Sequence, residues 1–405
     1  MTMRSSTDPA PPGPYDELFA WSAHMRATEP VFYDDSLGVW HVFGYADAKR
    51  AITEYETFSS EFTTPEEEMS IFSTGNIALM DPPQHRKFRN LVAKAFTPRS
   101  VAGLEPRLTR LCAELLDKVP TGRPVDFIED FASLLTTQVM AELLGIEQRH
   151  RHKLREWSDA LLSQNRTGME LEPALLAEIA RTTEEMDGFL RTELVRRREH
   201  PGDDLISGLV RAEVDGERLG DDEVVGIVTI FLVGGHITTT SVLASAAQCL
   251  HEHPDALAEL RADRSLVPTA VEEIIRYRPP FSRVVRRCTK ETRLGDRTVP
   301  AGSVVVVWLA SGNFDEAVFA DAERFVITRT PNPHLGFGNG VHFCLGAPLA
   351  RLEVRIALNA LLDRFERVTL RESAAPPDAY DPFGGILALR KLDVVFEEAL
   401  PGRAE

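Results

Sequence analysis

The chain has 405 residues, of which 43% are hydrophobic, so it can bury the core of one large domain or of two ordinary ones. Its 62 acidic residues against 45 basic ones give a net charge of −17, which argues against a protein that binds nucleic acid through a basic surface. The four cysteines, Cys112, Cys249, Cys288 and Cys344, form neither a C-x-x-C pair nor a disulfide-like framework, so we expect a reducing cytoplasm.

The N-terminal part of the chain is predicted to be a tail followed by a small hairpin. Residues 1–14 are rich in proline and polar side chains, and we expect a short flexible tail without the apolar segment of a signal peptide. Two strands are expected at 31–33 and 39–43, and a helix at 45–55. The polar, acidic stretch at 59–80 has no regular period, so we expect a long loop, of the kind that often carries function.

Helices dominate from residue 82 onward. The ranges expected as helices are 84–95, 98–119, 127–144, 149–164, 173–198, 203–213, 222–252, 254–262, 268–277 and 345–365. Strands are expected at 284–307, where apolar residues alternate with turn sequences, and at 386–396. With no internal repeat, low-complexity block or linker, the sequence predicts a mainly α chain with a minor β part and one domain over residues 15–400.

The helix expected at 222–252 contains an uncharged run from Val224 to Leu250 that is long enough to span a bilayer. Its centre reads GGHITTT, residues 234–240, and these polar and small residues cluster there rather than at the ends. Asp221 or Asp222 is suited to cap its start. A helix that is apolar on all sides lies either in a membrane or inside a large protein. In an otherwise soluble, acidic chain we favour the buried helix over the membrane span.

The glycine-rich segment FGNGVHFCLGAPLARLE, at 337–353, contains Cys344. Gly338 and Gly340 allow a tight turn, and a helix with apolar residues at three- and four-residue spacing follows. The sulfur therefore lies near a helix N-terminus, where the dipole favours a thiolate. Such a thiolate can be a nucleophile, a zinc ligand, a haem ligand or an inert core residue. His342 alone is close in sequence as a second zinc ligand or as a base.

This segment resembles the haem-binding segment of the cytochrome P450 family, with the pattern F-G-x-G-x-H-x-C-x-G-x-x-L-A-x-x-E. The residues that match its fixed positions are Phe337, Gly338, Gly340, His342, Cys344, Gly346, Leu349, Ala350 and Glu353. The resemblance implies the P450 fold, with the helix 222–252 crossing over a haem b. It also implies that Cys344 is the proximal ligand of the haem iron and that His342 contacts a haem propionate.

Further segments are similar to cofactor-binding parts of the same family. Asp81-Pro82-Pro83-x-His85-x-x-x-Arg89 is similar to the segment that reaches the propionates, with His85 and Arg89 on one helical face. Without the resemblance, this pair reads as a solvated basic face. Arg287 stands where the family has a propionate-binding arginine on a strand, and the neighbouring Arg286 would point to the other face.

Glu273 and Arg276 have the spacing of a family pair that joins a later arginine in a buried structural triad. By its position in the chain, we assign Arg324 as that arginine. A pair at this spacing on a surface contributes little, whereas a buried network is costly to break. Cys112, Cys249 and Cys288 are expected to be core residues.

In the family, a small-small-x-acid-Thr pattern on the long helix lies over the haem iron. The residues similar to it are Gly234, Gly235, His236, Ile237 and Thr238. The resemblance implies that Thr238 hydrogen-bonds the bound dioxygen, or the water that delivers protons to it; alternatively, the threonines satisfy carbonyl groups of their own helix. Ile237 stands where an acid usually relays protons. Water, the substrate, or the side chains of His236, Thr239 and Ser241 must then replace that acid.

The His-Ile-Thr-Thr sequence is similar to that of actinobacterial members of the family that tailor macrolides. The resemblance therefore implies a soluble, monomeric, cytoplasmic monooxygenase that hydroxylates or epoxidises a bulky hydrophobic small molecule, such as a macrolide or another polyketide of antibiotic biosynthesis. A terpenoid, fatty acid or carrier-bound substrate stays open, as do a peroxide-driven or oxidative-coupling enzyme and a non-catalytic haem-fold protein. The substrate contacts expected from the family are the loop 59–80, Gly234, Ile237, Phe281, Val284, Val285, Ile386 and Leu387.

The stretch 86–110 is basic in a chain that is acidic overall. Its basic residues, against the single acid Glu105, are Arg86, Lys87, Arg89, Lys94, Arg99, Arg107 and Arg110. By resemblance this stretch borders the proximal haem face, and we expect an acidic ferredoxin to dock there, steered by charge. We expect no flavin or NAD domain, so electrons would come from the ferredoxin and a ferredoxin reductase.

Overall fold

The structure is a computed structural model that describes residues 15–61, 74–164, 173–214, 216–371 and 385–398. The expected tail at 1–14 and the middle of the expected loop at 59–80 lie outside these residues. The chain forms two compact units. The first comprises Met1–Ser59, Glu105–Ala132 and Thr238–Glu405, and the second comprises Ser60–Leu104 and Ser133–Ile237.

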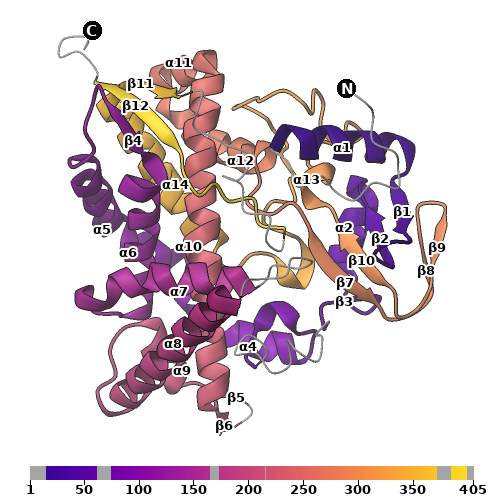
Figure 1. Ribbon diagram of the computed structural model, residues 1–405, viewed down its shortest axis with the longest axis horizontal. Helices are drawn as coiled ribbons and strands as arrows, with labels where there is room; N and C mark the ends of the chain where they lie inside the picture. Colours follow the sequence, from indigo (N-terminus) through magenta and orange to yellow (C-terminus); the bar gives the residue numbers. More distant parts are fainter. Residues whose placement is uncertain (1–14, 62–73, 165–172, 215, 372–384, 399–405) are drawn as a thin grey trace. The chain divides into compact units, whose positions relative to one another are not determined.

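A five-stranded sheet organises one part of the first unit (Figure 1). Its strands, in spatial order, are β1 (Val31–Asp34), β2 (Val39–Val42), β10 (Val304–Val307), β7 (Val284–Cys288) and β3 (Phe58–Ser59). Only the β2–β10 pair is parallel. Valines alternate along β10, so Val305 and Val307 pack with α2 (Tyr45–Thr53), whereas Val306 packs with α1 (Tyr15–Thr28).

The rest of the first unit is mainly helical. Its further elements are α11 (Pro254–Ala262), α12 (Val267–Tyr277), β8 (Thr292–Leu294), β9 (Arg297–Val299), α13 (Leu309–Gly312), α14 (Ala347–Arg364), β11 (Phe365–Leu370), β12 (Asp393–Glu398) and β4 (Pro124–Asp126). Strands β11, β12 and β4 form a second, antiparallel sheet, in which Phe365 stacks on Phe396 with ring centroids 4.3 Å apart. Helices α12 and α14 lie side by side, which brings the segments around residues 272 and 351 together.

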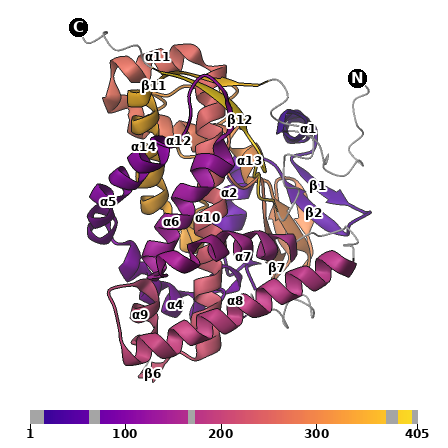
Figure 2. The ribbon, with the colours of Figure 1, turned by 60° about the vertical axis from the view of Figure 1, so that its left-hand side comes forward.

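The second unit consists of helices and one short hairpin. Its elements are α4 (Gln84–Val92), the start of α5 (Pro98–Leu116), α6 (Ser133–Leu144), α7 (Arg151–Gln164), α8 (Pro173–Glu199), α9 (Leu205–Val210), β5 (Glu213–Val214), β6 (Glu217–Arg218) and the first half of α10 (Asp221–Glu252). Figure 2 shows the long helix α8 running beside α7. Arg197 of α8 is buried and binds both Glu193 and Asp204, which joins α8 to the start of α9.

The long helix α10 is the one described helix that is long and apolar enough to cross a membrane by length and composition. Within its most apolar 18-residue window, 72% is buried inside the protein, as expected for a core helix. Gly220, rather than Asp221 or Asp222, precedes its first turn, and the Gly220 N–H donates to Glu223 Oε2 at 2.8 Å. The predicted cap was therefore wrong by one residue.

The expected mainly α fold with a minor β part is confirmed, and most elements agree with the predicted ranges within a few residues. The helix expected at 203–213 is shorter, because Gly216 adopts a φ of +86° and the chain turns into the β5–β6 hairpin. Helix α1 and strand β11 were not predicted. In the stretch expected as a strand at 386–396, the first part forms isolated bridges, including one between Ile386 and Phe281, and the regular strand β12 begins at Asp393.

Candidate functional site

Cys344 lies in the first unit, on a tight loop that a backbone hydrogen bond joins at its two ends. Gly338 and Gly340 have φ values of +70° and +69°, in the left-handed region where a side chain is strained. The Cys344 N–H donates to the Phe337 carbonyl at 2.8 Å. Helix α14 begins three residues later with Gly346 as its N-cap, so the sulfur stands at the helix start, as predicted. The loop thus carries Phe337, Gly338, His342 and Gly346, the residues expected to surround a haem.

Cys344 differs from the other three cysteines in its exposure. Cys112, Cys249 and Cys288 are fully buried, and burial raises the pKa of each thiol, to about 12 for Cys112 and Cys249. Cys344 is only partly buried. Since the buried thiols stay protonated at neutral pH, Cys344 is the cysteine suited to bind a metal as a thiolate.

The donor atoms available at Cys344 fit a haem better than a metal held by protein side chains alone. Across the described ranges, no three His, Cys, Asp or Glu side chains cluster closely enough to hold a metal ion. A structural or catalytic zinc needs three or four such ligands. A haem iron needs one axial ligand from the protein, because the porphyrin supplies the others. One accessible sulfur on a fixed turn meets that requirement.

His85 and Arg89 lie one turn apart on α4, in the second unit. His85 is buried, and burial lowers its pKa; the positive charge of Arg89 acts in the same direction, and Asp81 opposes it. The imidazole is therefore a neutral hydrogen-bonding group at neutral pH, beside a partly exposed guanidinium. Such a pair can bind a carboxylate, with Arg89 supplying the charge.

On β7 the structure corrects the choice between two neighbouring arginines. Arg287, the predicted propionate ligand, is exposed, whereas Arg286 is buried, with 8% of its surface accessible. Strand residues alternate between faces, and Cys288 already occupies the buried face that Arg286 shares. Of the two, the buried guanidinium is better suited to a carboxylate inside the protein, so the structure favours Arg286 over the predicted Arg287.

The GGHITTT segment presents a narrow accessible stripe on α10. Gly234, Gly235 and Thr238 are partly exposed, while Ile237 and Thr239 are buried. A Cβ at Gly235 would overlap the sulfur of Met140 on α6, so this glycine permits close helix packing. A Cβ at Gly234 would meet nothing within 4 Å, so open space lies beside that position. Gly234 and Thr238, four residues apart, therefore share an accessible face.

His236 faces the interior of the second unit. Its Nε2 lies 3.1 Å from the hydroxyl of Ser133, at the start of α6. Burial lowers the pKa of His236 to about 4, and the charge of Arg155 adds to that effect. The ring is therefore neutral at neutral pH, and its Nε2 accepts a hydrogen bond from the Ser133 hydroxyl or donates one to it, depending on the tautomer.

The residues expected to contact substrate lie in two places on the first unit and on α10. Phe281 bridges to Ile386, and the Leu387 N–H donates to the Pro280 carbonyl at 2.8 Å, so the backbone pairs these two segments. The Leu387 side chain packs against the cluster that contains Val306 and Trp308. Val284 packs against the core of the five-stranded sheet, and Val285 points to the exposed face. Gly234 borders open space, and Ile237 is buried in the helix.

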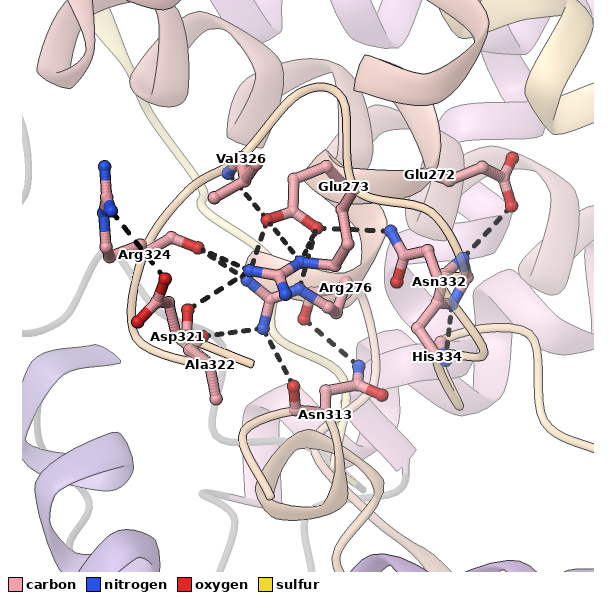
Figure 3. A network of polar contacts seen from close by, with 12 residues as sticks. Glu272, Glu273, Arg276, Asn313, Asp321, Ala322, Arg324, Val326, Asn332 and His334 are labelled. Atoms are coloured by element: carbon pink, nitrogen blue, oxygen red, sulfur yellow. Dashed lines mark hydrogen bonds and ion pairs between the residues drawn. The ribbon is translucent and has the colours of Figure 1, made fainter. Parts of the chain in front are cut away.

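The predicted structural triad is present with a different third member. Glu273 and Arg276 are fully buried and form two hydrogen bonds of 2.8 Å. Arg329 supplies the third side chain: its Nε lies 3.1 Å from Glu273 Oε2, and it is 8% exposed. Figure 3 shows the Arg324 side chain directed away from Glu273, toward Asp321, and it is 76% exposed. The prediction for Arg324 was therefore wrong. Its side chain does not join the triad, and Arg324 takes part only through its backbone carbonyl, which accepts a hydrogen bond from Arg276.

Two residues, Arg329 and Ser133, were missed, and Arg286 was named but its neighbour was chosen instead. Arg286 could have been found from strand alternation once Cys288 was placed in the core. Arg329 and Arg324 lie in the same irregular segment, which has no period to distinguish them. Ser133 is 103 residues from His236, so no local pattern joins them.

Comparison with known proteins gives consistent matches over nearly the whole chain. The sequence pattern of the Cytochrome P450 family matches residues 32–395. Cyclomarin C epoxidase CymV of Salinispora arenicola is 41% identical over 94% of this chain and 96% of its own. Erythromycin C-12 hydroxylase of Saccharopolyspora erythraea is 41% identical over 89% of this chain and 90% of its own. The solved structure of open cytochrome P450 EryK from S. erythraea superposes with a TM-score of 0.86, at 37% identity, over 98% of this chain and all of its own.

Proposed function

The chain belongs to the cytochrome P450 family, and we propose that it uses O2 to hydroxylate or epoxidise a macrolide or another bulky polyketide. The family, its fold and the monooxygenase class expected from the sequence are confirmed. The observation that carries the proposal is the partly exposed Cys344 on a glycine turn at the start of α14.

Cys344 would bind the iron of haem b, and the loop around it would hold the thiolate in place. Bound there, the haem activates O2, and thiolate ligation favours cleavage of the O–O bond. Arg286 and His342 of the first unit would bind propionate through charge and hydrogen bonds, and the family resemblance gives His85 and Arg89 the same role. Arg286 is buried on the inner face of β7, where its guanidinium is suited to bind a carboxylate.

Thr238 would hold a proton or a water molecule at the accessible face of α10. Its hydroxyl can donate and accept hydrogen bonds, and open space beside Gly234 leaves room for water or substrate. Ile237 cannot carry a proton, so His236 with Ser133, Thr239 or ordered water would replace the usual acid. The missing acid also keeps a second candidate open, a peroxide-driven or oxidative-coupling enzyme that needs no proton delivery from the helix.

The substrate is proposed from the apolar residues and from the relatives. Phe281 and Ile386 are apolar residues on paired backbone segments, and such residues suit contact with a large hydrophobic molecule. Two relatives at 41% identity are named as an epoxidase of cyclomarin C and a hydroxylase of erythromycin. The likeness to an erythromycin hydroxylase is the part of this comparison that favours a macrolide over a fatty acid.

A separate ferredoxin and ferredoxin reductase would supply the electrons. Arg86 and Lys87 on α4, and Arg99, Arg107 and Arg110 on α5, are exposed basic residues of an acidic chain. They can attract an acidic ferredoxin, and salt should weaken that attraction. The proposed setting is the cytoplasm, as a monomer, where all four free thiols stay reduced.

The proposed substrate class is tested by titrating the haem-loaded protein with macrolides, other polyketides, terpenoids and fatty acids. A molecule that enters the site and displaces water from the iron shifts the absorption spectrum toward the high-spin form. We expect this shift with macrolides or related polyketides, followed by product formation with ferredoxin, reductase and NADPH. A shift with fatty acids or terpenoids alone would contradict the substrate proposal. Spectral binding without turnover would favour the non-catalytic alternative.

A further inference from the structure

Glu272 precedes the buried Glu273 on α12 and links that helix to the Cys344 loop. Arg351 donates to both of its carboxylate oxygens, at 2.6 and 2.7 Å. The same carboxylate lies 3.2 Å from His334 Nε2, a contact drawn in Figure 3. Burial would raise the pKa of Glu272, but the hydrogen bonds from Arg351 and His334 outweigh it and lower the pKa to about 2. The carboxylate is therefore ionised throughout the neutral range.

His334 connects Glu272 to the backbone of the Cys344 loop. The Gly336 N–H donates to His334 Nδ1 at 3.2 Å. In the neutral ring, a nitrogen that accepts a hydrogen bond carries no proton, so the proton lies on Nε2, which then donates to Glu272. The imidazole is 3% exposed, so little water competes for these contacts. Glu272 thereby orients His334, and His334 fixes the backbone at Gly336.

Arg351 provides the second connection to the same loop. Its guanidinium lies 4.5 Å from the centre of the Phe337 ring, and the Phe337 carbonyl accepts the Cys344 N–H. The hydrogen bond to Glu272 is the main cause of a raised Arg351 pKa, and the charge of Cys344 acts in the same direction. Through Phe337 the guanidinium therefore lies beside the loop that carries the sulfur, and Glu272 offsets part of its positive charge.

We infer that Glu272, His334 and Arg351 are positioning residues that hold the Cys344 loop and balance the charge near its sulfur. This inference rests on the proposed function, in which that sulfur binds the haem iron. Adding an electron to the ferric site makes it more negative, so an unbalanced positive charge nearby favours the ferrous form. Loss of the Glu272 charge should raise the midpoint potential, and loss of the Arg351 charge should lower it.

The experiment is a dye-mediated reductive titration of the haem-loaded protein, with dithionite as the one-electron donor. The variants are Glu272→Gln, Arg351→Gln and the double variant. Arg355→Gln is a matched control, because Arg355 lies one turn further along α14, pairs with Glu105 at 2.9 Å and is 36% exposed, against 37% for Arg351. We expect opposite shifts for the two single variants, partial cancellation in the double variant, and no shift for the control. Shifts in one direction, or none, would overturn the inference, because a merely loosened loop affects both variants alike.

A second comparison applies if Glu272→Gln does not fold. Arg351→Lys keeps the charge but loses the bidentate geometry, so its potential should stay near that of the wild type while Arg351→Gln shifts. Equal shifts for Lys and Gln would overturn the charge argument. For the positioning argument, the Gly336 amide should exchange its hydrogen faster in His334→Ala than in the wild type, and unchanged exchange would contradict it.

The reduced CO spectrum of the wild type separates this inference from the proposed function. If the wild type shows a thiolate-type spectrum and the variants show no opposite shifts, only the positioning network is wrong. If the wild type lacks that spectrum, the ligand assignment fails first, and the inference falls with its premise.

Discussion

Replacing Arg329 by alanine tests the buried ion cluster, and we expect a far larger loss of stability than for Arg324→Ala. The Arg329 guanidinium donates to Glu273 and to the carbonyl oxygens of Ala320, Asp321 and Arg324. A hydrogen bond to a charged group contributes about 1.5–3 kcal/mol. Because Glu273 keeps its bonds to Arg276 after the change, we expect the free energy of unfolding to fall by about 2–3 kcal/mol.

Two further variants serve as references for the loss of unfolding free energy expected for Arg329→Ala. Arg276→Ala removes the main partner of Glu273 and leaves the carbonyls of Asn313, Ala322 and Arg324 without its guanidinium. Removing one partner of a buried ion pair typically costs about 3–5 kcal/mol, and the contact with Arg329 that Glu273 keeps places the expected loss at the lower end of this range. Arg324→Ala removes a side chain that is 76% exposed, so its effect should stay within about 0.5 kcal/mol. The expected order of destabilisation is Arg276→Ala, then Arg329→Ala, then Arg324→Ala.

The assay is urea unfolding followed by circular dichroism, with haem loss followed separately by absorbance. A bound cofactor disturbs two-state unfolding, so the variants should be compared at equal haem loading, by their midpoints and slopes. If Arg324→Ala lowered the midpoint as much as Arg329→Ala, the assignment of Arg329 to the cluster would be refuted.

Three other predictions concern the site. Thr238→Ala should uncouple NADPH consumption from product formation because the hydroxyl at the accessible face is lost, whereas Thr238→Ser should restore coupling; unchanged coupling in the alanine variant would contradict the proton role. His236 has a folded-state pKa of about 4 against about 6.5 when unfolded, so only the unfolded state binds its proton between these values, and stability should fall as pH falls through this window by up to about 1.4 kcal/mol per unit. His41 has the same shift, so His236→Asn should reduce the pH dependence without abolishing it; an unchanged slope would mean that His236 is not buried as described. Raising the salt concentration should slow haem reduction by ferredoxin, and a salt-independent rate would exclude steering by the basic residues.

The sequence was informative wherever a short local rule determines the structure. The turn at Cys344 could be predicted because glycine is required for positive φ, and both Gly338 and Gly340 adopt it. The β1–β2 hairpin and α10 followed from apolar periodicity and turn residues. Their positions therefore agree with the predictions to within one or two residues.

The errors concern choices that depend on contacts distant in sequence. Whether Arg324 or Arg329 reaches Glu273 depends on the path of an irregular segment, which no periodicity describes. The faces of Arg286 and Arg287 depend on the register of β7 against β10. Gly235 was expected at the oxygen-handling face, but its packing against Met140 depends on how α6 lies along α10.

The central claim is that Cys344 ligates a haem iron, and the reduced CO spectrum tests it most directly. The wild type should give the thiolate-type spectrum, and Cys344→Ala should lose it. Cys288→Ala is the matched control, because Cys288 is buried and has a raised pKa, so its removal should leave the spectrum unchanged. A thiolate-type spectrum retained in Cys344→Ala, or lost in a folded Cys288→Ala protein, would contradict the account.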